Sequence, residues 1–211
     1  DKGIITRDDA PYFLELLMSY DEDLRLRAWG IVSILVNKGI ITVEEAKRMK
    51  NYFLDLLESE FDCIRSRAWD AVKYLIDKGV ITVEEAKERK DCFLGLLASA
   101  NEAARLDAWH NIGDLIDKGV ITLDEARRMK GYFLELLESN REKMMWWGWR
   151  NIEDLIRKGV ITRDEALHFL ELLLSGNEKV RREAWYEVVY LIYEGVITVE
   201  EAKRMKNYFL E

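Results

Sequence analysis

The sequence predicts an all-α fold of stacked antiparallel helix pairs, and three observations carry that prediction. Glycines recur at spacings of 36, 40, 40, 40 and 36 residues, a period typical of stacked supersecondary units. Three residues after each glycine stands a threonine, and three residues after each threonine stands Asp or Glu. Between these marks, apolar residues recur at helical spacing. The glycines are Gly3, Gly39, Gly79, Gly119, Gly159 and Gly195.

Residues 39–78 form one complete repeat. Its first helix, the A helix, begins after Thr42, which can form a capping box with Glu45. Its second helix, the B helix, runs from about residue 63 to residue 78, and Gly79 ends it in the left-handed conformation. Each helix has one apolar face, made of Ala46, Met49, Phe53, Leu56 and Leu57 in the A helix and of Ile64, Ala68, Trp69, Val72, Leu75 and Ile76 in the B helix.

The other copies repeat these features. The capping threonines are Thr6, Thr42, Thr82, Thr122, Thr162 and Thr198. Each complete B helix has a tryptophan at one fixed position, namely Trp29, Trp69, Trp109, Trp149 and Trp185. We expect these five side chains to be buried between repeats. The first and fifth repeats lack four residues of the A helix, about one turn, so the deletion nearly preserves the apolar face.

We expect a single domain over residues 1–211, with about five and a half repeats and 11 helices. The repeats cover about 1–38, 39–78, 79–118, 119–158 and 159–194, followed by a half repeat at 195–211. Residues 197–210 match residues 41–54 letter for letter, so neither end has the polar outer face that usually caps a solenoid. We therefore expect self-association through the ends, unless short-range adjustments cover them.

Composition limits the classes of partner. The chain has 211 residues, of which 34% are charged, and it contains no glutamine, a balance found in thermostable or designed helical proteins. The net charge of −8 argues against nucleic acid and anionic membranes as partners. Cys63 and Cys92 form no C-x-x-C pair and are expected to be free thiols. Without a signal peptide or an apolar run of transmembrane length, the expected location is cytoplasmic, and no cofactor is expected.

The fifth repeat resembles the HEAT repeat. It reads F-L-E-L-L-L-S and then N-E-K-V-R-R-E-A-W-Y-E-V-V-Y-L-I, with V-R-x-x-A opening the B helix, and the first three repeats are similar. The resemblance implies a right-handed α-solenoid that uses its B helices to bind partners. It also implies an arginine ladder between repeats, at Arg25, Arg65, Arg105 and Arg181. The fourth repeat departs from the pattern, because Met145 and Gly148 replace the arginine and the alanine.

Differences between the B helices indicate a candidate binding face. On a helical wheel the near-constant positions fall in one arc and the variable positions fall opposite. Such a face either drifts freely in solvent or binds a partner, and its aromatic residues favour binding. Trp147 should point outward, flanked by residues of adjacent repeats. The alternative is that one of Trp146 and Trp147 folds over a neighbouring helix and fills the space left by Gly148. The candidate partner-binding residues are Trp146, Trp147, Arg150, Asn151, Asp154, His110, Tyr186, Tyr190 and Tyr74.

Catalytic and metal-binding patterns are weak. Asp107, His110 and Asp114 share one helical face and could hold a metal or form an acid–base pair, but such a group is usually plain surface. Nothing matches a nucleophile elbow or a phosphate loop. We therefore expect no enzyme activity, no catalytic residues and no metal.

Three functions compete. The first is a natural scaffold that binds a protein or peptide. The second is an engineered HEAT-type binder, favoured by the 14-residue identity but opposed by drift at framework positions such as Val36 and Ile76. The third is a DNA glycosylase of the HEAT-like kind, opposed by the absence of a basic channel. The sequence favours the scaffold, and natural or engineered origin stays open.

Overall fold

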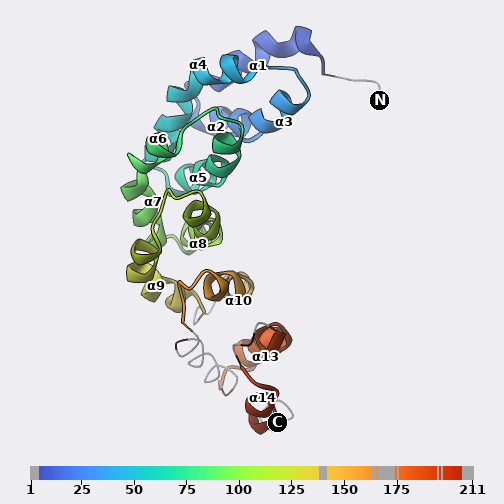
Figure 1. The fold of residues 1–211 in the computed structure, drawn as a ribbon, viewed down its shortest axis with the longest axis vertical. Coiled ribbons are helices and arrows are strands. Elements are labelled where there is room, and N and C mark those ends of the chain that lie inside the picture. Colours follow the sequence, from blue (N-terminus) through green and yellow to red (C-terminus); the bar gives the residue numbers. More distant parts are fainter. Residues whose placement is uncertain are drawn as a thin grey trace. The chain divides into compact units, whose positions relative to one another are not determined.

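The computed structural model describes residues 5–137, 142–162, 165, 174, 176–193, 195 and 197–205. Secondary structure within these residues is helical throughout, with no strand. The chain divides into two compact units, residues 1–121 and 122–211 (Figure 1). One continuous domain over the whole chain stays a prediction.

The first unit contains the helices of the first three repeats. The A helices are η1 (Arg7–Asp9) with α1 (Ala10–Leu17), α4 (Val43–Leu54) with η2 (Asp55–Glu58), and α6 (Val83–Lys87) with α7 (Lys90–Leu97). The B helices are α2 (Glu22–Gly30) with α3 (Val32–Asn37), α5 (Asp62–Asp77) and α8 (Glu102–Asp117). In Figure 1, α4, α6 and α7 form one layer of this unit, and α2, α5 and α8 form the other. Neighbouring B helices are in contact, α2 with α5 and α5 with α8.

The second unit contains α9 (Leu123–Leu137), α10 (Glu142–Arg157), α13 (Glu178–Tyr193) and α14 (Val199–Met205). The B helix α10 packs against its A helix α9 and against the next B helix, α13. The side chains of Trp146, Trp149 and Arg150 lie outside the described part of α10, so the expectations for them stay predictions.

The predicted capping boxes are present. Thr42 accepts a hydrogen bond from the amide of Glu45 at 3.1 Å, and the Glu45 carboxylate accepts one from the amide of Thr42 at 2.8 Å. This reciprocal pair satisfies two backbone donors that a helix N-terminus leaves without partners. The same pair of bonds forms at Thr82, Thr122, Thr162 and Thr198. At Thr6, the amide donates to the Asp9 carboxylate at 2.7 Å.

The predicted glycine turns are also present. Gly79 has φ of +66°, a left-handed conformation that costs glycine little. Its amide donates to the Ile76 carbonyl at 2.8 Å and the Val80 amide donates to the Leu75 carbonyl at 2.9 Å. These two bonds are the Schellman motif, which satisfies the last carbonyls of the helix. The four other described turn glycines, at positions 39, 119, 159 and 195, have φ between +68° and +74°.

Two of the expected helices are interrupted. The first B helix breaks between α2 and α3, where Ile31 has φ of −107° and ψ of 1°. Gly30 precedes the break, at the position that Asp70 and His110 occupy in the next two repeats. Glycine weakens a helix interior because it loses the most backbone entropy on folding. In the third repeat, the A helix breaks at Arg89, which separates α6 from α7.

The repeated tryptophans form the core of the first unit. Trp29, Trp69 and Trp109 are each 1% exposed. Each indole N–H donates to a leucine carbonyl 12 residues earlier, at 3.1 to 3.2 Å. The rings of Trp29 and Trp69 lie 5.3 and 5.1 Å from Phe53 and Phe93 of the following repeat, so these tryptophans join adjacent repeats as predicted. For Trp185 the prediction of full burial is wrong, because that side chain is only partly buried.

Candidate partner-binding surface

The exposed face of the B helices is narrower than the wheel predicts. The position two residues after the tryptophan belongs to the variable arc, yet it is buried in every described B helix after the first: Ala71, Asn111, Asn151 and Glu187. These helices also contact neighbouring B helices, since α5 packs against α2 and α8, and α10 packs against α13. Asn151 is only 8% exposed, so it does not belong to the exposed part of this face.

The outward side of the B helices is limited to a few positions. They lie two residues before the tryptophan and one, five and eight residues after it. We call these positions the outer strip. The exposed members described on α5, α8, α10 and α13 are Arg67, Asp70, Tyr74, Asp77, Asp107, His110, Asp117, Trp147, Arg157, Tyr186, Tyr190 and Tyr193. Among these exposed members are five of the residues predicted to contact a partner, namely Tyr74, His110, Trp147, Tyr186 and Tyr190.

In the first unit, α5 and α8 border a polar groove of about 390 Å³. Two predicted residues, Tyr74 and His110, line it from opposite helices. The remaining lining is Ser66, Arg67, Asp70, Lys73, Asp107 and Asn111. Because both signs of charge are present, the groove suits polar groups of a peptide better than a phosphate backbone.

Lys73 is the electrostatic centre of this groove. Its ammonium group lies 2.6 Å from the Asp114 carboxylate on α8 and 3.7 Å from Asp70 on its own helix. It also lies 4.9 Å from the ring centre of Tyr74, within range of a cation–π contact. Partial burial disfavours the charged lysine, but the hydrogen bond and the charge of Asp114 outweigh that effect and raise the pKa of Lys73.

Asp107 has a raised pKa although part of the residue is exposed. Desolvation by neighbouring side chains is the main cause, and the negative charge of Asp70 adds to it. The neighbouring His110 and Arg67 side chains and a hydrogen bond from the Ser66 hydroxyl act in the opposite direction. The carboxylate is therefore already held by α5, through Ser66, and faces the groove with its charge partly compensated.

The sequence singles out Asp107, His110 and Asp114 as a group that could hold a metal or form an acid–base pair. Asp114 is engaged by Lys73, as described above. Across the described residues, no three His, Cys, Asp or Glu side chains are grouped so that they could hold a metal ion. Cys63 and Cys92 are both free thiols.

In the second unit, α10 presents Trp147 on the outer strip. Trp147 is 39% exposed, which agrees with its predicted outward position. Seven residues later, Asp154 is half-buried and forms an ion pair with Arg157. Gly148 is buried, and a Cβ added there would lie 3.0 Å from Cδ2 of Leu137 on α9. Leu137 therefore occupies the space beside Gly148.

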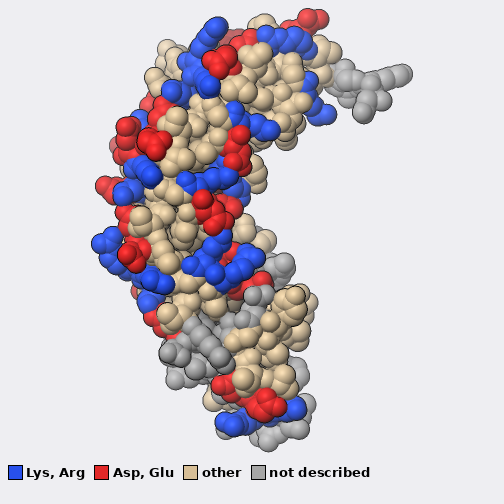
Figure 2. All heavy atoms as spheres, in the orientation of Figure 1, with Lys and Arg blue, Asp and Glu red and all other residues tan. Residues whose placement is uncertain are grey.

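The next B helix, α13, presents three tyrosines on the outer strip: Tyr186, Tyr190 and Tyr193. Tyr186 is 68% exposed and Tyr190 is 52% exposed. Both line an apolar groove of about 590 Å³ together with Arg182, Trp185, Val188 and Val189. In the view of Figure 2, the surface over α13 is largely uncharged, whereas acidic and basic residues alternate over the first unit.

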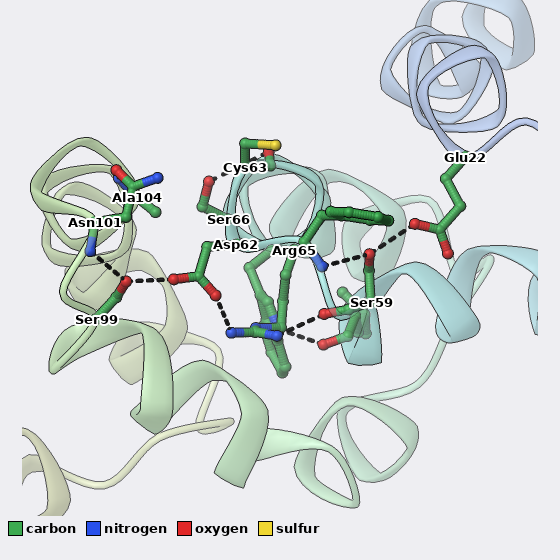
Figure 3. Close-up of polar contacts among 12 residues, drawn as sticks. Glu22, Ser59, Asp62, Cys63, Arg65, Ser66, Ser99, Asn101 and Ala104 are labelled. Carbon is green, nitrogen blue, oxygen red and sulfur yellow. Dashed lines mark hydrogen bonds and ion pairs between the residues drawn. The ribbon is translucent and has the colours of Figure 1, made fainter.

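The predicted arginine ladder takes a different form. Arg65 donates to the carbonyl of Ser59 at 2.5 Å and pairs with Asp62, both in its own repeat (Figure 3). Arg25 likewise donates to the Ser19 carbonyl at 2.7 Å. These arginines therefore brace the turn between the A and B helices of one repeat, and the expectation that they bond between repeats is wrong for Arg25 and Arg65.

Serines and acidic residues make the link between repeats. The Ser59 hydroxyl donates to the Glu22 carboxylate of the preceding repeat at 2.7 Å, and the Ser99 hydroxyl donates to Asp62 in the same way (Figure 3). Sequence analysis missed this link, although a signal was present. A serine stands six residues before each arginine and an acidic residue stands three before it in the first three repeats.

The fold and this surface define an all-helical protein in which the same contacts recur at the spacing of the sequence repeat. Comparison with known protein families and with curated proteins found no match to the chain. Among the described helices, none is long and apolar enough to cross a bilayer.

Proposed function

We propose that the protein is a non-enzymatic scaffold of the α-solenoid type, built from stacked antiparallel HEAT-like helix pairs with a right-handed superhelical twist. Its outer strip binds a protein or peptide. The single observation that carries this proposal is the exposure of large aromatic side chains at outer-strip positions of three B helices, α5, α10 and α13. Tyr74 on α5, Trp147 on α10, and Tyr186 and Tyr190 on α13 are all exposed members of the strip.

Aromatic residues at such positions suit a binding surface. Trp and Tyr are enriched among the residues that dominate binding energy, since they bury a large area at low entropic cost. Around Tyr74 the outer strip has charged groups of both signs, such as Arg67, Asp70 and Asp107, which is the composition of a polar rim beside an aromatic anchor. A peptide with apolar anchors and mixed charge fits this surface best.

The test is a peptide library selected against the full chain, followed by affinity measurements on substituted chains. Trp147→Ala should weaken a selected peptide that contacts the strip by about 2 kcal/mol, and the melting temperature should change by no more than a few degrees because the side chain is exposed. Tyr12→Ala is the matched control, because Tyr12 is an exposed aromatic residue on the A helix α1, away from the strip.

Two results would contradict the proposal. One is a selected set of peptides whose affinities respond to Tyr12→Ala and not to substitution of Tyr74, Trp147 or Tyr186. The other is a collapse of stability on Trp147→Ala, which would make that side chain part of the core.

A further inference from the structure

The polar groove between α5 and α8 contains a buried hydrogen-bond acceptor without a partner. Asn111 on α8 lines this groove and is only 3% exposed. Its side-chain Oδ1 is buried, and none of the described residues donates a hydrogen bond to it. A buried polar atom in this state costs free energy, because it has lost its contact with water and has gained no bond in return. A ligand with an N–H donor would remove that cost.

Two carboxylates line the same groove, Asp70 on α5 and Asp107 on α8. They are close enough that the charge of Asp70 helps to raise the pKa of Asp107. Asp107 receives a hydrogen bond from the Ser66 hydroxyl, and Asp70 has an ion pair with Lys73 at 3.7 Å. Two like charges held near each other favour the approach of a cation.

The two cations that line the groove are engaged by other carboxylates. Lys73 lies 2.6 Å from Asp114, which is closer than its 3.7 Å to Asp70. Arg67 pairs with Asp23 of the preceding repeat at 3.7 Å. These contacts balance both cations with carboxylates that do not line the groove, so the charges of the two lining carboxylates are left in excess.

We propose that this groove binds the side chain of an arginine in a peptide that lies along the outer strip. The inference rests on the proposed function, and it names the residue type that the strip selects in the first unit. A guanidinium has several N–H donors in one plane, so it can bond both to carboxylates and to Oδ1 of Asn111. The ring of Tyr74 lines the groove and is 49% exposed, so a guanidinium can also stack on it.

The size and position of the groove suit one side chain. Its volume of about 390 Å³ is near the lower end of the roughly 300–1,000 Å³ typical of ligand sites. Tyr74 and His110 line it from opposite helices, and both are exposed members of the outer strip. A peptide on the strip therefore passes beside the groove and can extend one long side chain into it. Lysine fits less well, because its ammonium group is a compact charge without a plane that stacks.

The experiment titrates the full chain with the blocked peptide acetyl-Gly-Arg-Gly-amide. Binding is followed by NMR, from the side-chain amide of Asn111 and the carboxyl carbon of Asp107. Both signals should shift along one saturating curve, with a Kd of about 1 mM. The same peptide with citrulline in place of arginine is the matched control, because citrulline has the same shape without the charge. Its affinity should be at least about tenfold weaker.

Two substitutions in the protein test the acceptors. Asn111→Leu should weaken binding of the arginine peptide about tenfold without lowering the melting temperature, because it replaces a buried polar atom that has no partner with an apolar group of similar size. Asp70→Asn should also weaken binding about tenfold, since it removes a charge that the guanidinium contacts. Asp77→Asn is the matched control, because Asp77 is exposed on the same helix outside the groove, and it should leave the affinity unchanged.

Three results would overturn the inference. One is equal affinity for the arginine and citrulline peptides, and another is a titration without curvature up to about 10 mM peptide. The third is tighter binding of free arginine than of the blocked peptide, which would assign the groove to a small cationic molecule.

Failure of this inference is distinguishable from failure of the proposed function. Library peptides that respond to Trp147→Ala, with no response of any selected peptide to Asp70→Asn, would refute the arginine site and leave the scaffold standing. Saturable binding of the arginine peptide, with no peptide selected from the library, would support the site and count against the scaffold.

Discussion

At the scale of single residues, the same tryptophan position has different surroundings along the chain. Trp109 is fully buried and its indole N–H donates to the Leu97 carbonyl at 3.1 Å. Trp185 occupies the equivalent position and keeps part of its ring exposed beside the groove of α13. Position in the repeat therefore predicts which residue type occurs, while the neighbouring repeat determines how deeply that residue is buried.

This difference predicts unequal costs of truncation. Trp109→Ala should lower the free energy of unfolding by about 3–5 kcal/mol, because it removes a buried ring and leaves a cavity. Trp185→Ala should cost clearly less, since part of that ring is already in water. Urea denaturation of both variants measures the difference. A cost below about 1 kcal/mol for Trp109→Ala would contradict its place in the core.

An ion pair between repeats should be visible in a titration. The Arg7 guanidinium forms two hydrogen bonds to the Glu45 carboxylate, at 2.7 and 2.6 Å. Together with hydrogen bonds from the Thr42 amide and hydroxyl, they lower the pKa of Glu45 from 4.5 to about 2. Because the folded pKa is depressed, the stabilisation is present above pH 4.5 and is lost as the pH falls toward 2. Arg7→Met should raise the pKa of Glu45, as measured by NMR of its carboxyl carbon. Lys47→Met is the control, because Lys47 pairs with Glu44, and an unchanged pKa in Arg7→Met would refute the coupling.

At the scale of helices, the sequence predicts where a helix begins and ends more reliably than whether it continues without a break. Thr42, Glu45 and Gly79 act locally, so their capping bonds follow from the order of residues alone. The break between α2 and α3 follows one glycine. The free energy that a glycine costs in a helix interior is small, and packing against a neighbouring helix can offset it. The link from Ser59 to Glu22 joins two repeats, so it becomes evident only when the repeats are placed side by side.

Two glycines allow the helix-end argument to be tested. Gly79 has φ of +66°, so Gly79→Ala should destabilise the protein by about 1–2 kcal/mol, the cost of a left-handed conformation for alanine. Gly95 lies inside α7 with open space where a Cβ would project, so Gly95→Ala should stabilise by about 0.5–1 kcal/mol. Thermal unfolding of the pair gives the comparison. Shifts of the same sign in both variants would be the contradictory result.

At the scale of the whole molecule, charge sets a further limit. The net charge is −8, and the groove between α5 and α8 mixes Arg67 and Lys73 with Asp70 and Asp107. Since duplex binding depends on clustered cations, affinity for a random DNA duplex at physiological salt should be about 10⁻⁴ M or weaker. Fluorescence anisotropy with a labelled duplex measures it. Submicromolar binding would favour the glycosylase alternative over the scaffold.

Only part of the candidate surface is predictable from the sequence, because contacts between helices bury residues that a helical wheel places outward. A helical wheel places Trp147 and Tyr186 outward correctly, because both positions lie opposite the buried arc of their helix. It does not show that Asn151 is buried, because it takes no account of contacts at the sides of a helix. Ser66 and Ala71 sit at flank positions of the same kind on α5, and both are buried. A wheel that includes both flanks separates these residues from the outer strip.

Contacts such as that between Lys73 and Asp114, and that between Ser99 and Asp62, have a consequence for the ancestry and engineering of the chain. The serine link can re-form after a rearrangement, because a serine and an acidic residue recur at these positions in each of the first three repeats. The lysine contact is specific to its joint: transposing residues 39–78 with residues 79–118 would keep every cap and every tryptophan, yet Asp114 would then follow a copy with Ser33 in place of Lys73. Substitutions at positions 73 and 114 should therefore be inherited as a pair, and a shuffled gene would encode the same helices with this seam mismatched.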